Sequence, residues 1–297
     1  MNPRSWNIIV IALTVLLAAT AAILDYERNF FGVFGDVKGQ RYLVYDNERT
    51  TKYLFGYNYI PSNFDGILIG SSISRNWNTG EITGVRMYNL SMDGANISEE
   101  SLIVDQVLHR RHPKIAIILI FPYLTETSGR KSGFMNTQEY WGALGSVQLL
   151  RAYGHKWLID HGKVREDFNE FGARDDEPPH GQPNLQAHAE FVIDPGALND
   201  YSDVLARLRS SGTKIVGVIP PTEIEHWNLD RGAYLAYYSR VLPMFHADEP
   251  VINLQTDLEI VVKDKSNFVD GYHLSNAAAQ EVVHAINARL HQDGLLQ

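Results

Sequence analysis

The sequence predicts an α/β fold in which a parallel sheet carries helices on both faces and one N-terminal transmembrane helix precedes it. Short apolar runs alternate with longer helical patterns from residue 64 to the C-terminus, which is typical of a parallel sheet. The run from Ile115 to Phe121 is apolar at every position, as expected for a strand buried on both faces. Trp6 to Leu24 is a run of 19 residues without a charge, long enough to cross a bilayer.

The N-terminal run predicts export of the rest of the chain. Arg4 and the α-amino group precede it, and Asp25, Glu27 and Arg28 follow it. This weak charge bias favours an N-terminus inside and the bulk of the protein outside the cytoplasm. The small-residue sequence Ala19-Thr20-Ala21 leaves a cleaved signal peptide as the alternative. Because the run is longer than a typical signal core, we favour an anchor at residues 1–24, with the domain in the periplasm or at the cell surface.

Composition excludes several classes of partner and site. The net charge of −9 argues against nucleic acid, because phosphate binding needs clustered basic side chains. The chain has no cysteine, which excludes disulfides and thiolate metal sites, and its histidines lack the spacing of metal ligands. We therefore expect no metal and no cofactor.

The first part of the exported chain is expected to be a linker. Residues 25–60 are rich in Phe and Tyr, which either lie at the membrane interface or pack on the domain. A single catalytic domain is expected over residues 61–297. Within it, residues 123–195 have poor periodicity and many helix breakers, and they are expected to form an insertion at the carboxyl edge of the sheet.

The elements of this domain are predicted in order from its apolar runs and helix signals. Glycine or proline bounds several of the strands, and Pro122 ends the longest apolar run. Strands are expected at residues 67–69, 85–90, 115–121, 214–219 and 251–254. Helices are expected at residues 98–109, 197–210, 232–244 and 275–290.

Two short motifs at opposite ends of the domain suggest a serine nucleophile and its base. The first strand ends in Gly70-Ser71-Ser72, which leaves a hydroxyl at the edge where open α/β sheets bind ligands. Taken alone, such a serine more often caps a helix. Asp270 and His273 lie three residues apart before the last helix. A nucleophilic serine needs a base and a group that orients the base, and one short loop supplies both.

This combination resembles the SGNH/GDSL hydrolase superfamily. Gly70, Ser71 and Ser72 stand in place of the family's Gly-Asp-Ser, and Asp270 and His273 match its second motif. The resemblance extends from residue 64 to the C-terminus and implies a three-layer, flavodoxin-like fold. The Gly-Ser-Ser form is similar to that of membrane-anchored relatives that acylate cell-envelope polymers, of the teichoic-acid D-alanylation and exopolysaccharide acetylation type.

The resemblance implies a role for each matched residue. Ser72 would be the nucleophile, with Ser74 as a rival, His273 the base and Asp270 the residue that orients it. The backbone N–H groups of Ser72 and Gly94 would bind the oxyanion.

Other positions fit the family's pattern less well. The family's Asn donor after the third strand is missing, since Phe121 to Glu126 stand there. Asn96 and Tyr123 are possible substitutes. Arg75 and Tyr123 are candidates for substrate binding, although Arg75 is as easily a solvated surface residue.

The sequence therefore predicts acyl transfer outside the cytoplasm by a Ser-His-Asp mechanism. The resemblance suggests O-acetylation of an exopolysaccharide or envelope glycan, with a membrane acyl-donor protein as partner. One alternative is a carbohydrate or lipid esterase of the same fold. Another is a catalytically silent protein that binds a glycan or serves as a scaffold, which the missing Asn donor favours.

Overall fold

A computed structural model describes residues 2–35, 48–126, 135, 137–145, 147–165, 167–175 and 188–296. Its centre is a five-stranded parallel sheet with the order β2-β1-β3-β4-β5, which confirms the predicted fold class. This order is that of flavodoxin-like sheets. The strands are β1 (Gly66–Ile69), β2 (Met87–Asn89), β3 (Ile115–Leu119), β4 (Lys214–Ile219) and β5 (Val251–Asn253).

The strand order places a crevice at the carboxyl ends of β1 and β3. Leu68 pairs with Asn89 of β2 on one side and with Ile117 of β3 on the other. The chain leaves β1 toward β2 and then crosses over β1 to reach β3, so the direction of winding reverses here. Ligands bind at such switch points in open α/β sheets. All residues of β1, β2 and β3 are buried, so this edge stands on a rigid core.

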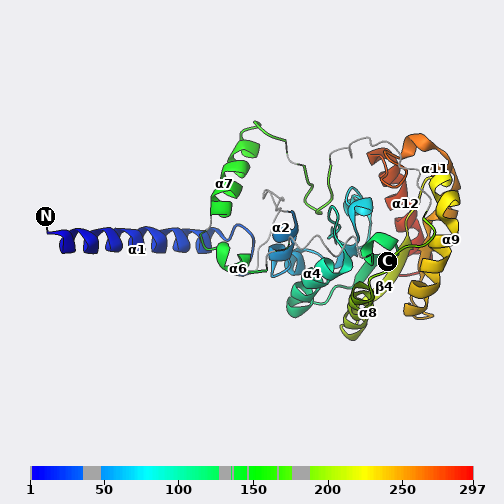
Figure 1. Cartoon of the computed structure of the whole chain (residues 1–297), viewed down its shortest axis with the longest axis horizontal. Coiled ribbons are helices and arrows are strands. Elements are labelled where there is room, and N and C mark those ends of the chain that lie inside the picture. The colour runs from blue at the N-terminus through cyan, green and yellow to red at the C-terminus, as the bar shows by residue number, and fades with distance from the viewer. Residues whose placement is uncertain are drawn as a thin grey trace.

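Helices cover both faces of the sheet (Figure 1). Right-handed crossovers place the helices after β2 and β3 on the same face, where they pack side by side and Arg207 pairs with Asp105. The last helix packs against the β1–β2 connection, where the Thr83 backbone N–H donates to Asn287. The main helices are α4 (Ile97–Arg110), α8 (Pro195–Ser210), α9 (Ile224–Val241) and α12 (Asn276–Gln292).

Short elements complete the described chain. Some of them lie just after the carboxyl end of a strand. The short α-helices are α2 (Glu48–Phe55), α3 (Tyr59–Asn63), α6 (Glu139–Gly142), α10 (Leu254–Asp257) and α11 (Glu259–Lys263). The 3₁₀ turns are η1 (Ser72–Ser74), η2 (Thr79–Glu81), η3 (Pro122–Leu124), η4 (Leu242–Met244) and η5 (Lys265–Asn267).

The N-terminal apolar run is a continuous helix that projects from the domain (Figure 1). Helix α1 (Pro3–Arg28) has no buried residue along its length. Among the described residues it is the single helix long and apolar enough to cross a membrane. A membrane anchor and a signal sequence both have this form.

The described part of residues 25–60 packs on the domain, which is one of the two expectations for this range. Phe30 and Phe31 are buried, and so is most of α2 and α3. The predicted linker is therefore folded onto the core from residue 48 onward. Its residues 36–47 lie outside the described part of the chain.

The predicted insertion, residues 123–195, does not lie in one place. Residues 167–175 and 188–193 approach the carboxyl edge of the sheet, as expected. By contrast, α6 and α7 (Val147–Asp160) lie beside the end of α1, away from that edge (Figure 1). Residues 127–134, 136, 146, 166 and 176–187 lie outside the described chain.

Candidate active site

Ser72 opens the 3₁₀ turn η1 directly after β1, and Gly70 makes this turn possible. A Cβ on Gly70 would lie 2.2 Å from the Ser74 hydroxyl and 2.8 Å from that of Ser91, closer than real contacts allow. Ser74, the rival nucleophile, is buried, and its hydroxyl lies 2.7 Å from the Ser91 hydroxyl. The tight turn therefore directs Ser74 into the core, whereas Ser72 stays partly exposed at the crevice.

The structure brings the two predicted motifs together. His273 Nε2 lies 2.9 Å from Ser72 Oγ, and His273 Nδ1 lies 2.7 Å from Asp270 Oδ2. Both distances are those of hydrogen bonds between a nucleophile, a base and the group that orients the base. Ser72 and His273 are 201 positions apart, so the fold alone creates this contact.

Asp270 is held by its own loop as well as by His273. Its Oδ1 accepts backbone N–H groups of Tyr272 at 3.0 Å and His273 at 2.8 Å. Partial burial by itself raises the pKa of Asp270, but the hydrogen bonds from His273 and the loop outweigh it and lower that pKa to about 2. Asp270 is therefore a carboxylate at neutral pH and fixes the proton of His273 on Nδ1.

A second histidine–carboxylate pair, at the start of α9, contacts the loop between Asp270 and His273. His226 and Glu223 are buried, and His226 Nδ1 lies 2.7 Å from Glu223 Oε2. The Glu223 backbone N–H donates to the Gly271 carbonyl at 3.0 Å. Gly271 has a φ of +94°, and a Cβ there would lie 2.3 Å from the His226 ring. The loop between Asp270 and His273 is thus clamped against the start of α9.

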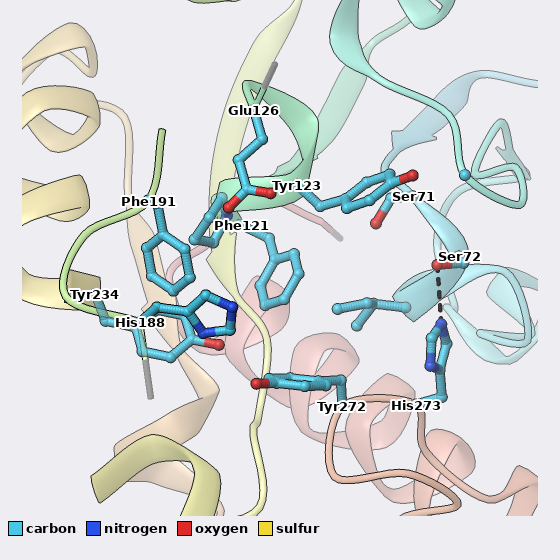
Figure 2. A pocket seen from close by; sticks show the side chains of 13 residues that line it. Ser71, Ser72, Phe121, Tyr123, Glu126, His188, Phe191, Tyr234, Tyr272 and His273 are labelled. Atoms are coloured by element: carbon cyan, nitrogen blue, oxygen red, sulfur yellow. Dashed lines mark hydrogen bonds between the residues drawn. The ribbon is translucent and has the colours of Figure 1, made fainter. Parts of the chain in front are cut away.

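Two backbone donors belong to residues that line the cavity above Ser72. Among the described residues, the N–H groups of Ser72 and Gly94 have no hydrogen-bond partner, and both residues line the same cavity. A Cβ on Gly94 would lie 3.5 Å from the Tyr123 hydroxyl, which also lines the cavity. Figure 2 shows that hydroxyl pointing toward the Ser72 end. Tyr123 is therefore the better placed of the two candidates for the missing side-chain donor.

The side chains of the other two candidates, Asn96 and Arg75, make contacts with neighbouring parts of the fold. Asn96 is buried, and its side chain accepts the Glu99 N–H at 3.1 Å as the N-cap of α4. Arg75 is buried against Asp93 and is absent from the described lining of the cavity. Neither residue is among the described residues that line the cavity.

Charged residues hold the loop that carries Gly94. Asp93 pairs with Arg75 and also with Arg174 at 3.1 Å, while the Arg49 guanidinium donates to the Asp93 carbonyl. Below them, the buried Lys52 donates to the Ser91 carbonyl at 2.6 Å. Arg49 and Lys52 both come from α2, within the range predicted to be a linker.

The cavity above Ser72 has a volume of about 410 Å³ and is lined mainly by aromatic side chains. Figure 2 shows Ser72 and His273 at one end and His188, Phe191 and Tyr234 at the other, with the Tyr272 ring between the two ends. The remaining lining residues are Ser71, Ile73, Gly94, Phe121, Pro122, Tyr123 and Glu126.

The far end of the cavity contains a histidine that the sequence did not single out. Asp230 is buried, and its Oδ1 accepts the His188 backbone N–H at 2.7 Å while its Oδ2 lies 2.9 Å from His188 Nδ1. Because Asp230 bonds Nδ1, Nε2 is the ring nitrogen left to hydrogen-bond a ligand in the cavity. Burial, followed by the nearby carboxylates of Asp230 and Asp270, raises the pKa of Tyr272 to about 12, so Tyr272 remains a hydroxyl donor.

Comparisons with known proteins give distant structural likenesses. No family model and no curated protein matches the chain. The chain is similar to a protein described as a platelet activating factor from Streptococcus pneumonia (11% identity, TM-score 0.46, covering 94% of this chain and 99% of that one). It is also similar to a lipase/acylhydrolase from Enterococcus faecalis (11% identity, TM-score 0.40, covering 78% of this chain and 96% of that one). A third similar structure is the acetyl xylan esterase AlAXEase (13% identity, TM-score 0.42, covering 76% of this chain and 98% of that one). Because these likenesses are so distant, function is inferred from the geometry of the cavity.

Proposed function

We propose that the protein is an SGNH-type serine enzyme that forms an acyl-enzyme on Ser72. The observation that carries this proposal is the hydrogen-bonded chain from Ser72 through His273 to Asp270 at one end of the cavity. The unpartnered backbone donors at Ser72 and Gly94 supply the second requirement, a site for developing negative charge.

The first half-reaction transfers the acyl group to the enzyme. Ser72 Oγ attacks the carbonyl carbon of the acyl donor while His273 Nε2 takes the serine proton. The carbonyl oxygen becomes an oxyanion beside the N–H groups of Ser72 and Gly94, and the Tyr123 hydroxyl serves as the third donor. The tetrahedral intermediate then collapses, and His273 returns its proton to the departing alcohol. Asp270 stabilises the imidazolium throughout.

The second half-reaction transfers the acyl group to an acceptor hydroxyl. His273 removes the acceptor's proton, the acceptor oxygen attacks the Ser72 ester, and Ser72 Oγ leaves and recovers a proton from His273. The far end of the cavity combines the rings of Tyr234 and Phe191 with a hydrogen-bonding ring nitrogen of His188, and the Tyr272 ring lies between this end and Ser72. This combination suits an acceptor with both apolar and hydroxyl-bearing faces, such as a sugar.

On this basis the reaction is O-acetylation of an envelope glycan, outside the cytoplasm, with α1 as a membrane anchor. An acyl donor held by a membrane protein would complete the system. Hydrolysis of the same ester by water is the competing outcome, because it uses the same acyl-enzyme and differs only in the acceptor.

The test is an assay of the full-length protein with 4-nitrophenyl acetate, with and without an acetylatable glycan. We expect the glycan to accelerate release of nitrophenol and to become acetylated, and we expect Ser72→Ala to abolish both. Release that is unaffected by any glycan would overturn transfer and leave the esterase. Release no faster than that of Ser72→Ala would overturn the enzyme altogether and leave the silent scaffold.

A further inference from the structure

The two helices beside the end of α1 expose large apolar side chains. Trp141 of α6 is 72% exposed, and Leu150 and Trp157 of α7 are 71% and 56% exposed. Leu150 and Trp157 are seven positions apart, so they lie on the same face of α7. We call these three side chains the α6–α7 surface. Tryptophan is rarely left this open to water on a soluble protein, so the surface indicates a partner.

Direct contacts attach helices α6 and α7 to the end of α1 and to the residues that follow it. The Tyr153 hydroxyl donates to Asp25 Oδ1 at 3.1 Å, and the Tyr153 and Phe30 rings meet edge to face with centroids 5.0 Å apart. Tyr140 of α6 packs similarly on Phe34 at 6.0 Å. Helices α6 and α7 are therefore held against the last turn of α1 and the residues after it.

The length of α1 and the aromatic residue at its end indicate where the outer boundary of a bilayer would lie. Its 26 residues span about 39 Å, against about 30 Å for the hydrocarbon core. Tyr26 at the end of α1 is 58% exposed, in the position of an aromatic interface residue. Asp25, and the Tyr153 bound to it, would thus lie at the outer boundary of the membrane.

The orientation of α7 also suits the membrane surface. In Figure 1 its axis runs across that of α1, so α7 lies in the plane of the bilayer when α1 spans it. Arg151 and Lys163 are exposed on and just after α7, where anionic head groups would attract them.

We propose that the α6–α7 surface inserts into the interface of the same bilayer that α1 spans. Its ligand is the lipid surface, with Trp141, Leu150 and Trp157 in the head-group and upper acyl region. A single spanning helix leaves the domain free to tilt, whereas this second contact fixes the orientation of the domain above the membrane. The proposal rests on α1 being an anchor but is independent of the chemistry proposed at Ser72.

The absence of cysteine from the chain permits a direct test. Full-length Leu150→Cys and Trp157→Cys would each carry one nitroxide label and be reconstituted in phosphatidylcholine–phosphatidylglycerol vesicles. The matched control is Leu235→Cys on α9, an exposed leucine (54%) on the far side of the domain from α1. Leu16→Cys reports whether α1 is inserted. Both test residues are exposed, so these changes leave the core intact.

The readout is the ratio of collisions with oxygen to collisions with a water-soluble nickel chelate. We expect labels at 150 and 157 to favour oxygen by several-fold relative to the label at 235. A label at 150 as accessible to the chelate as that at 235, while the label at 16 is in hydrocarbon, would overturn the proposal. Chelate access at both 16 and 150 would overturn the anchor and the lipid contact together. Since no activity is measured, failure of the Ser72 chemistry would not change these results.

Discussion

Ser72 and His273 act as one unit in the proposed chemistry, because the serine attacks only while the histidine takes its proton. Ser72→Ala and His273→Ala should each lower kcat by about 10³-fold or more, and the double variant should be little worse. Asp270→Ala should cost less, because the base remains but loses its orientation. The measurement is kcat and KM for acetyl-ester turnover. Independent, multiplicative losses in the double variant would show that the two side chains do not work together.

His188 and Asp230 should affect the acceptor and leave the acyl-enzyme step alone. His188→Ala removes the ring nitrogen Nε2 that is free to bond the glycan, and Asp230→Asn removes the carboxylate that bonds Nδ1. For a glycan acceptor, we expect KM to rise about tenfold, the effect of losing one or two hydrogen bonds. Turnover of 4-nitrophenyl acetate without glycan should not change.

The control for this comparison is His109→Ala, because His109 is exposed on α4 and lies outside the described lining of the cavity. Equal losses with and without glycan in the His188 variant would show that the far end of the cavity supports the fold or the nucleophile instead.

Local patterns allowed prediction of the residues at the Ser72 end of the cavity. Ser72 follows a buried strand, and Asp270 and His273 share one short loop, so sequence neighbours identify all three. His188 and Asp230 are 42 positions apart, and no local signal connects them. Asn96 was a candidate oxyanion donor by position, but it lies outside the described lining of the cavity, and its side-chain oxygen caps the first turn of α4.

Helix α2 is an element that local sequence signals did not reveal. Its eight residues include two threonines and two aromatic residues, which are poorer helix formers, and they lie in the aromatic-rich range 25–60 that was predicted to be a linker. The structure buries Lys52 by giving it Glu48 at 3.0 Å and the Ser91 carbonyl at 2.6 Å. The Glu48 pair is local to the helix, but the Ser91 contact is tertiary, and helix propensity does not report it. Through this contact, α2 helps to position the loop that carries Gly94.

Glu100 of α4 lies fully buried near this group of charges. Burial raises its pKa well above the usual value, with Lys52 opposing the shift. Because the pKa of Glu100 is higher in the folded protein than in the unfolded chain, the fold is most stable below the unfolded pKa and loses stability as the pH rises above it. Glu100→Gln, which cannot ionise, should match the wild type near pH 4 and be more stable by about 1–3 kcal/mol near pH 8.

The measurement is chemical denaturation of the full-length protein in detergent at both pH values. Lower stability of Glu100→Gln at pH 8 would contradict the burial argument and show that Glu100 is an ionised partner of Lys52.

Apolar runs predicted the strands of the sheet well, because β3 and β4 are buried at nearly every position. Helix α9 begins at Ile224, eight residues before the predicted start, since Glu223 caps it and also holds the catalytic loop. Helices α6 and α7 were not predicted. Their apolar residues are divided between the core and the exposed α6–α7 surface, which removes the usual amphipathic period.

At the scale of the whole molecule, α1 and the domain form an anchored enzyme in the proposed arrangement. Fractionation should therefore recover the protein with membranes, and protease added from the extracytoplasmic side should cleave the domain. Protein recovered in full length from the cytosol, or protected from outside protease in intact cells, would contradict this topology.

The central claim is that Ser72 is a nucleophile activated by His273, and covalent labelling tests it most directly. A fluorophosphonate reacts with such a serine and leaves a stable adduct, which mass spectrometry of the digested protein assigns to one residue. We predict an adduct on Ser72 in the full-length protein, none at this position in Ser72→Ala, and labelling at least 10³-fold slower in His273→Ala. An unlabelled Ser72, or equal labelling rates with and without His273, would contradict the claim.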